Sequence, residues 1–103
     1  MDGRIVRIAN EMKKVISDIL MYELKDPRIP QMTSVTKVDL TKDLKYAKVY
    51  VSVYGSEAEK ASCMLALKKS AGYIRREIGK RMIIRILPEL NFKLDESIEY
   101  GAY

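Results

Sequence analysis

Apolar residues recur every three or four positions over the first part of the chain, which is the spacing of one helix face. They are Ile5, Ile8, Met12, Val15, Ile16 and Ile19. This spacing predicts an amphipathic helix from Arg4 to Leu24. Asp26-Pro27 should end it, because the residue before a proline avoids the α conformation and proline has no amide proton to donate. The opposite face mixes cations with acids, so we interpret it as mainly solvated.

Strict alternation of apolar and polar residues follows in the middle of the chain. From Tyr46 to Tyr54, Ala47, Val49, Val51 and Val53 fall on one side, and tyrosines with Lys48 fall on the other. The β-branched segment from Thr33 to Leu40, with Thr36, Val38 and Leu40 on one face, precedes it across a short turn. The two segments are predicted to form an antiparallel hairpin whose apolar face lies under helices. Two interpretations of the tyrosines stay open: they stack nucleobases, or they pair across strands to cover the sheet.

A second helical stripe begins after Ser56 and Glu59, which have the spacing of a capping box. The stripe consists of Ala61, Met64, Leu67, Ala71, Ile74 and Ile78, and Gly79 is the expected stop. Gly72 interrupts its middle, and a glycine inside a helix costs roughly 1 kcal/mol relative to alanine. We therefore interpret Ser70-Ala71-Gly72 as a kink that joins two helices. The alternative is a glycine that allows close packing of the helix on the sheet.

A last apolar series predicts a third strand. It contains Ile84, Ile86, Leu90, Phe92 and Leu94, with Pro88 marking an irregularity or an edge position. The order is then helix, strand, strand, helix, kink, helix, strand, which is an α+β fold with a three-stranded sheet. A length of 103 residues suits one domain, which we place at residues 1–95 with a short, loosely held tail at residues 96–103. No apolar segment approaches the ~20 residues of a membrane span, and the first helix lacks the apolar core of a secretory signal, so we expect a cytoplasmic protein.

Positive charge is concentrated in one part of the chain. Between Lys68 and Arg85 there are seven cations and a single acid, Glu77, whereas the whole chain carries a net charge of +5. The surplus of this segment therefore exceeds that of the entire chain. A clustered surplus of this kind attracts a polyanion through the release of condensed counterions, which favours RNA or DNA as the partner over an ordinary solvated helix face.

The chain lacks the residues on which several classes of enzyme depend. The chain has no histidine and only one cysteine, Cys63, which we interpret as a small packed or half-exposed side chain rather than a nucleophile. Its five glycines never reach the spacing of a phosphate-binding loop. Carboxylates fall in adjacent surface pairs instead of clusters that would hold a metal. We expect no catalytic residue, cofactor, metal or small-molecule substrate, and an RNA-cleaving activity is the least favoured hypothesis.

Four segments in this order resemble the ribosome-binding factor A family. They are Lys25-Asp26-Pro27-Arg28, Asp43 to Val53, Gly72-Tyr73-Ile74-Arg75-Arg76, and Arg85 to Phe92. The resemblance runs from Arg4 to about Asp95. It implies a type II KH-like fold, binding to the ribosomal RNA of the immature small ribosomal subunit, and support for late maturation. Processing of the RNA 5′ end and growth at low temperature are further implications.

One departure from general KH domains concerns the kink. Such domains clamp nucleotides with a GxxG loop, whereas the family carries Ala-x-Gly, and Ser70-Ala71-Gly72 stands at this position here. Candidate phosphate-binding residues are Lys68, Lys69, Arg75, Arg76, Lys80, Arg81 and Arg85, and Arg4, Arg7 and Lys48 are secondary candidates. We expect a monomer without membrane contact. The alternative function is a protein-interaction module that docks on a ribosomal protein or another assembly factor through the tyrosine face.

Overall fold

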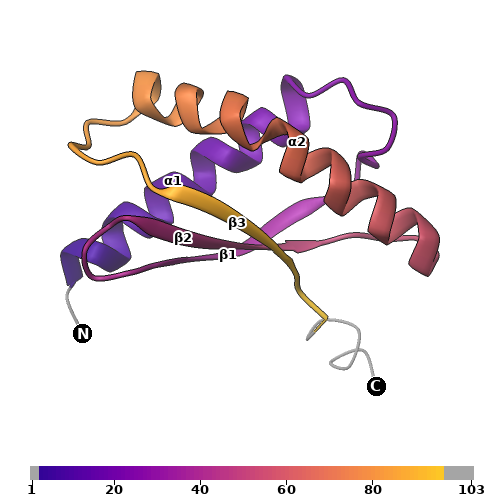
Figure 1. The fold of residues 1–103 in the computed structure, drawn as a ribbon, viewed down its shortest axis with the longest axis horizontal. Helices are drawn as coiled ribbons and strands as arrows, with labels where there is room; N and C mark the ends of the chain where they lie inside the picture. The colour runs from indigo at the N-terminus through magenta and orange to yellow at the C-terminus, as the bar shows by residue number, and fades with distance from the viewer. Residues whose placement is uncertain (1–2, 97–103) are drawn as a thin grey trace.

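The computed structural model describes residues 3–96, which form two helices and one three-stranded sheet (Figure 1). The elements are α1 (Gly3–Tyr22), β1 (Ser34–Leu40), β2 (Tyr46–Ser52), α2 (Glu57–Arg81) and β3 (Glu89–Leu94). In the sheet β2 lies in the centre, antiparallel to β1 and parallel to β3. The predicted α+β class is confirmed. Most of the tail expected at residues 96–103 lies outside the described residues.

Helix α1 buries the predicted face against the sheet. Met12, Ile16 and Ile19 are fully buried, and Ala9 and Leu20 complete the buried face. The helix ends at Tyr22, two residues before the predicted end, and Asp26 and Pro27 follow in an irregular segment. Spacing at threes and fours was therefore sufficient to locate this helix, because its burial comes from one continuous face.

The hairpin of β1 and β2 forms as predicted, but β1 carries an irregularity. A shift of register between Val35 and Lys37 breaks the alternation at Thr36. Val35 and Val38 are consequently the buried residues of β1, and the prediction that Thr36 shares a face with Val38 is wrong. Thr36 instead donates a hydrogen bond of 2.6 Å to Oδ2 of Asp95, just beyond β3. The extra residue in a bulge turns its side chain away from the pattern of its neighbours.

Helix α2 begins as predicted and ends later. Ser56 accepts from the amide of Glu59 while the Glu59 carboxylate accepts from the amide of Ser56, so the capping box is confirmed. Gly79 does not stop the helix, which continues to Arg81. An alanine Cβ at Gly79 would lie 3.1 Å from Cδ1 of Leu87, so this glycine admits the loop that folds back on α2.

No turn separates the two helices predicted on either side of Ser70-Ala71-Gly72. The backbone is helical throughout Glu57–Arg81, so the two segments form one element, whose axis changes direction near its middle in Figure 1. Gly72 is exposed, and a Cβ at this position would meet only Nη1 of Arg76, at 3.6 Å. Close packing against the sheet therefore does not explain this glycine.

The buried stripe of α2 differs from the predicted one in its first half. Lys60, Cys63 and Ala66 are buried where Ala61 and Met64 were expected, and Leu67, Ile74 and Ile78 are buried as predicted. Cys63 is fully buried, with its sulfur 3.9 Å from Oγ1 of Thr33.

The third strand is shorter than its apolar pattern suggested. β3 starts at Glu89, so Ile84 and Ile86 lie in the preceding loop and their assignment to a strand is wrong. Pro88 is fully buried directly before β3 and has no amide proton for the ladder, which accounts for the late start. Leu90 and Phe92 complete the core, and both helices lie on the same side of the sheet (Figure 1). The other face exposes Tyr46 and Lys48.

Candidate nucleic-acid interface

Four cations surround Gly72 on the outer face of α2. Lys68 and Lys69 precede it by four and three residues, and Arg75 and Arg76 follow it by three and four. Side chains at these spacings lie on one helix face, and all four residues are exposed. The buried residues Leu67, Ile74 and Ile78 lie on the opposite side of the helix. We call these four residues together with Gly72 the basic face.

The basic face contains cations without acidic partners. Lys68 and Arg76 form no ion pair within residues 3–96, and neither does Arg85 in the following loop. Lys69 exerts a weak attraction on Asp26. The pKa of that carboxyl falls to about 2, mainly because Arg28 donates hydrogen bonds to it. The charges of Lys68, Lys69 and Arg76 are thus available to an anionic ligand in solvent.

Arg75 is exposed and also forms hydrogen bonds with the loop before β3. Its Nη2 donates to the carbonyl oxygen of Leu87 at 2.7 Å, and its Nε donates to that of Pro88 at 3.1 Å. These bonds hold the loop before β3 against α2. The charge of Arg75 is not cancelled, since carbonyl groups are neutral, but its orientation is fixed by the loop.

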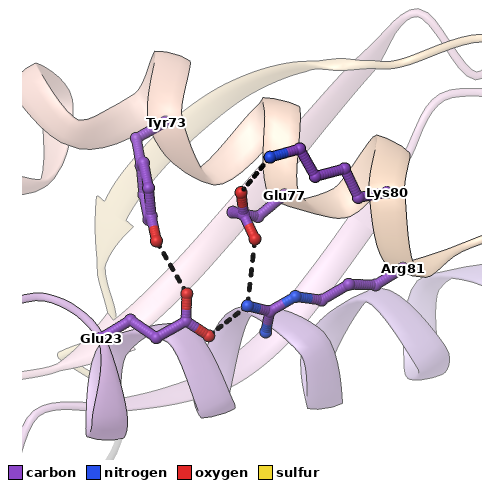
Figure 2. Close-up of polar contacts among 5 residues, drawn as sticks. All are labelled: Glu23, Tyr73, Glu77, Lys80 and Arg81. Carbon is purple, nitrogen blue, oxygen red and sulfur yellow. Dashed lines mark hydrogen bonds and ion pairs between the residues drawn. The ribbon is translucent and has the colours of Figure 1, made fainter.

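Lys80 and Arg81, two of the predicted phosphate ligands, form ion pairs with acids (Figure 2). Nζ of Lys80 lies 3.2 Å from Oε2 of Glu77, and Nη2 of Arg81 lies 3.1 Å from Oε1 of the same carboxylate. Arg81 also pairs with Glu23, just after α1, and Tyr73 donates a hydrogen bond of 2.8 Å to Glu23. Figure 2 shows the carboxylates of Glu23 and Glu77 both contacting the same guanidinium nitrogen of Arg81, Nη2. We call these five residues the acidic-basic cluster.

The acidic-basic cluster shifts the ionisation of its members in the direction its contacts require. The hydrogen bond from Arg81, and then that from Tyr73, lowers the pKa of Glu23 below its ordinary value of 4.5. The hydrogen bond that Tyr73 donates to Glu23 raises the pKa of the Tyr73 hydroxyl above 10.0. The hydrogen bonds that Arg81 donates to Glu23 and Glu77 raise the pKa of Arg81. Glu23 lies 58 residues from Arg81 in sequence, so no local pattern revealed this contact. The cluster connects the end of α1 to the last turns of α2.

The secondary candidates lie away from the basic face. Lys48 is on the open sheet face, in register with Asp39 on β1 and Asn91 on β3. Arg4 and Arg7 are in the first turns of α1. Arg4 lines a surface hollow together with Arg85, and none of the four cations around Gly72 is among the lining residues of that hollow. The ten predicted cations consequently occupy several surfaces.

The remaining chemistry of the described chain is sparse. Within residues 3–96 no three carboxylates or thiols converge as metal ligands would. Burial raises the pKa of the Cys63 thiol, which makes it a poorer nucleophile. Neither helix among these residues is both long and apolar enough to cross a bilayer.

Two helices on one face of a mixed three-stranded sheet place the protein in the class of KH-like α+β domains. A family model described as Ribosome-binding factor A matches residues 4–103, and the chain belongs to this family. It is 60% identical over 100 residues to Ribosome-binding factor A of Acetivibrio thermocellus, covering 97% of this chain and 81% of the relative. The corresponding protein of Caldanaerobacter subterraneus is 56% identical over 102 residues, with 99% and 84% covered.

Structures of related proteins agree with this assignment. A solution structure from Thermotoga maritima has a TM-score of 0.78 at 30% identity and covers 87% of this chain and 85% of its own. A homology model of the Thermus thermophilus ribosome binding factor A has a TM-score of 0.70 at 25% identity, with 85% and 91% covered. That second structure was fitted into an electron cryo-microscopy map of a complex with the 30S subunit.

Proposed function

We propose that this protein is a monomeric, non-catalytic assembly factor that binds the ribosomal RNA of the immature small subunit in the cytoplasm. Its role is to support late maturation, including processing of the RNA 5′ end and growth at low temperature. The observation that carries the proposal is the basic face, where four exposed cations surround Gly72 on one continuous helix. The Thermus thermophilus relative fitted into a map of its 30S complex supports the small subunit as the partner.

The arrangement of the basic face suits the backbone of folded RNA. Phosphate groups are bound by clustered cations that release condensed counterions, and such contacts position a protein without reading sequence. Gly72 leaves the centre of the cluster without a side chain, so a phosphate can approach the helix closely while cations lie on both sides. The acids of the acidic-basic cluster neutralise Lys80 and Arg81, which reduces their contribution.

The salt dependence of binding tests the number of phosphate contacts. Four contacts predict that the logarithm of the affinity falls with the logarithm of salt concentration at a slope of about −3, taking roughly 0.7 to 0.9 per contact. Affinity for purified immature small subunits is measured over a series of potassium chloride concentrations. A slope near zero contradicts binding through the basic face.

Charge reversal locates the binding surface. Lys68→Glu combined with Arg76→Glu removes two exposed cations that have no acidic partner within the described residues, and binding to the subunit should be lost. Arg75 is left intact, because it holds Leu87 and Pro88. The control is Lys37→Glu with Lys93→Glu, which makes the same charge change on the open sheet face, where Lys37 lies 3.8 Å from Asp39. This variant should leave binding within a few-fold of wild type.

The control also distinguishes the protein-docking alternative. If the sheet face carries the interaction, Lys37→Glu with Lys93→Glu, or Tyr46→Ala, abolishes subunit binding and the α2 variant retains it. Circular dichroism of each variant verifies that the fold is intact. That pattern would refute the proposed role of the basic face.

A further inference from the structure

The loop between α2 and β3 exposes two large apolar side chains. Ile83 is fully exposed and Ile86 is 42% exposed. An isolated exposed isoleucine is ordinary on a protein surface, but two within four residues of a short loop are a patch. They lie beside a surface hollow of about 390 Å³.

The hollow combines an apolar floor with positive charge. Ile8 from α1 and Leu44 from the hairpin turn line it together with Ile83 and Ile86. Arg4 and Arg85 are also among its lining residues, and no acidic residue within the described chain is. Arg85 forms no ion pair within residues 3–96. A ligand that fits this hollow therefore has a flat or compact apolar part and a negative charge.

The hollow is joined to the basic face through the backbone of the loop. Arg75 donates hydrogen bonds to the carbonyl oxygens of Leu87 and Pro88, so one residue of the basic face fixes the loop that forms the hollow. Leu87 also packs over the bare backbone of Gly79 on α2. This loop contains no Asp or Glu from residue 82 to residue 88, so it presents no acidic side chain to a polyanion that reaches it from the basic face.

We propose that this hollow binds the base of one unpaired nucleotide in the RNA that α2 holds. The base lies against Ile83, Ile86 and Leu44, and the flanking phosphates lie near Arg4 and Arg85. Unstacked bases of RNA are recognised in this way, by apolar contact and by guanidinium groups, whereas paired bases are inaccessible. The inference rests on the proposed function, since it requires RNA on the basic face. It adds a preference for RNA that contains a bulged or unpaired residue.

Two RNA hairpins provide the probes: one is fully paired, and the other has the same sequence with a single bulged 2-aminopurine ribonucleotide inserted. The wild-type protein should bind the bulged hairpin about tenfold more tightly than the paired one, which corresponds to 1.4 kcal/mol. The fluorescence of 2-aminopurine should change on binding, because the base leaves water for the hollow. Ile83→Ser should bring the affinity ratio close to one while affinity for the paired hairpin is retained.

Controls separate the outcomes. Met32→Ser replaces another exposed apolar side chain, outside the hollow, and should keep the tenfold ratio. Arg85→Gln should reduce the ratio and leave the stability of the fold unchanged, since Arg85 has no partner within residues 3–96.

Failure of the inference differs from failure of the proposed function. If both hairpins bind equally and Ile83→Ser changes nothing, the nucleotide site is refuted while RNA binding stands. If neither hairpin nor the immature subunit binds, the proposed function itself fails. A third probe is an acidic peptide that contains leucine. If this peptide binds the wild-type protein but not Ile83→Ser, and does not displace RNA, the hollow binds a protein segment and the nucleotide proposal is overturned.

Discussion

Replacing Gly72 by alanine should stabilise the protein and weaken RNA binding at once. The residue lies within the continuous helix α2, is exposed, and does not have a positive φ angle. Alanine is favoured over glycine in a helix interior by about 0.8–1.0 kcal/mol, chiefly because glycine loses more backbone entropy on folding. The new Cβ would lie 3.6 Å from Nη1 of Arg76, an ordinary van der Waals distance. No steric cost opposes the gain, so Gly72→Ala should raise the free energy of unfolding by about 1 kcal/mol.

Thermal and urea unfolding measure this gain. A change of 1 kcal/mol corresponds to a shift of about 4 °C or more in Tm for a domain of this size. Gly79→Ala is the matched control, because it makes the same change seven residues later on the same helix. There the Cβ would lie 3.1 Å from Cδ1 and 3.2 Å from Cδ2 of Leu87, which must move. The gain from Gly79→Ala should therefore be smaller than that from Gly72→Ala.

The same methyl group should reduce affinity for RNA, because it occupies the gap among the cations of the basic face. Stability and affinity then move in opposite directions, a result that loss of folding does not produce. A lower Tm for Gly72→Ala would refute the claim that alanine fits the helix at this position better than glycine does. Unchanged affinity would refute the close approach of phosphate at Gly72.

Three further substitutions test the core, the α2 cap and the acidic-basic cluster. Ile16→Ala removes a fully buried side chain of α1 and should lower the free energy of unfolding by about 2–5 kcal/mol in urea denaturation; a loss well below this range would contradict tight packing on the sheet. Ser56→Ala removes the acceptor of the Glu59 amide and should cost about 1 kcal/mol by the same assay, whereas Ser62→Ala, inside α2, should cost less. Glu23→Gln should destabilise the protein at neutral pH but not far below pH 4.5, because a lowered carboxyl pKa contributes stability above its unfolded value and loses it as the pH falls through the folded one. A difference between Glu23→Gln and wild type that persists at low pH would show that ionisation of Glu23 is not its cause.

Local patterns determined most of the element order. The face of α1, the alternation in β2 and the capping box of α2 each depend on residues close together in the chain, so periodicity and spacing were sufficient to predict them. The concentration of cations between Lys68 and Arg85 is likewise visible without coordinates. Helical spacing also places Lys68, Lys69, Arg75 and Arg76 around Gly72, because side chains three and four residues apart share a face.

Contacts between distant residues decided what the sequence left open. Thr36 leaves the alternation of β1 where its hydroxyl bonds Asp95, 59 residues away. Glu23 forms an ion pair with Arg81, 58 residues away in the sequence, so Arg81 is not a cation without an acidic partner. Gly79 is a packing position because Leu87 lies against it, whereas the side chain that lies near Gly72 is that of Arg76, from the same helix. Secondary structure and charge density follow from neighbouring residues, whereas the partner of each charge depends on which elements the folded chain brings together, and only the tertiary structure decides that.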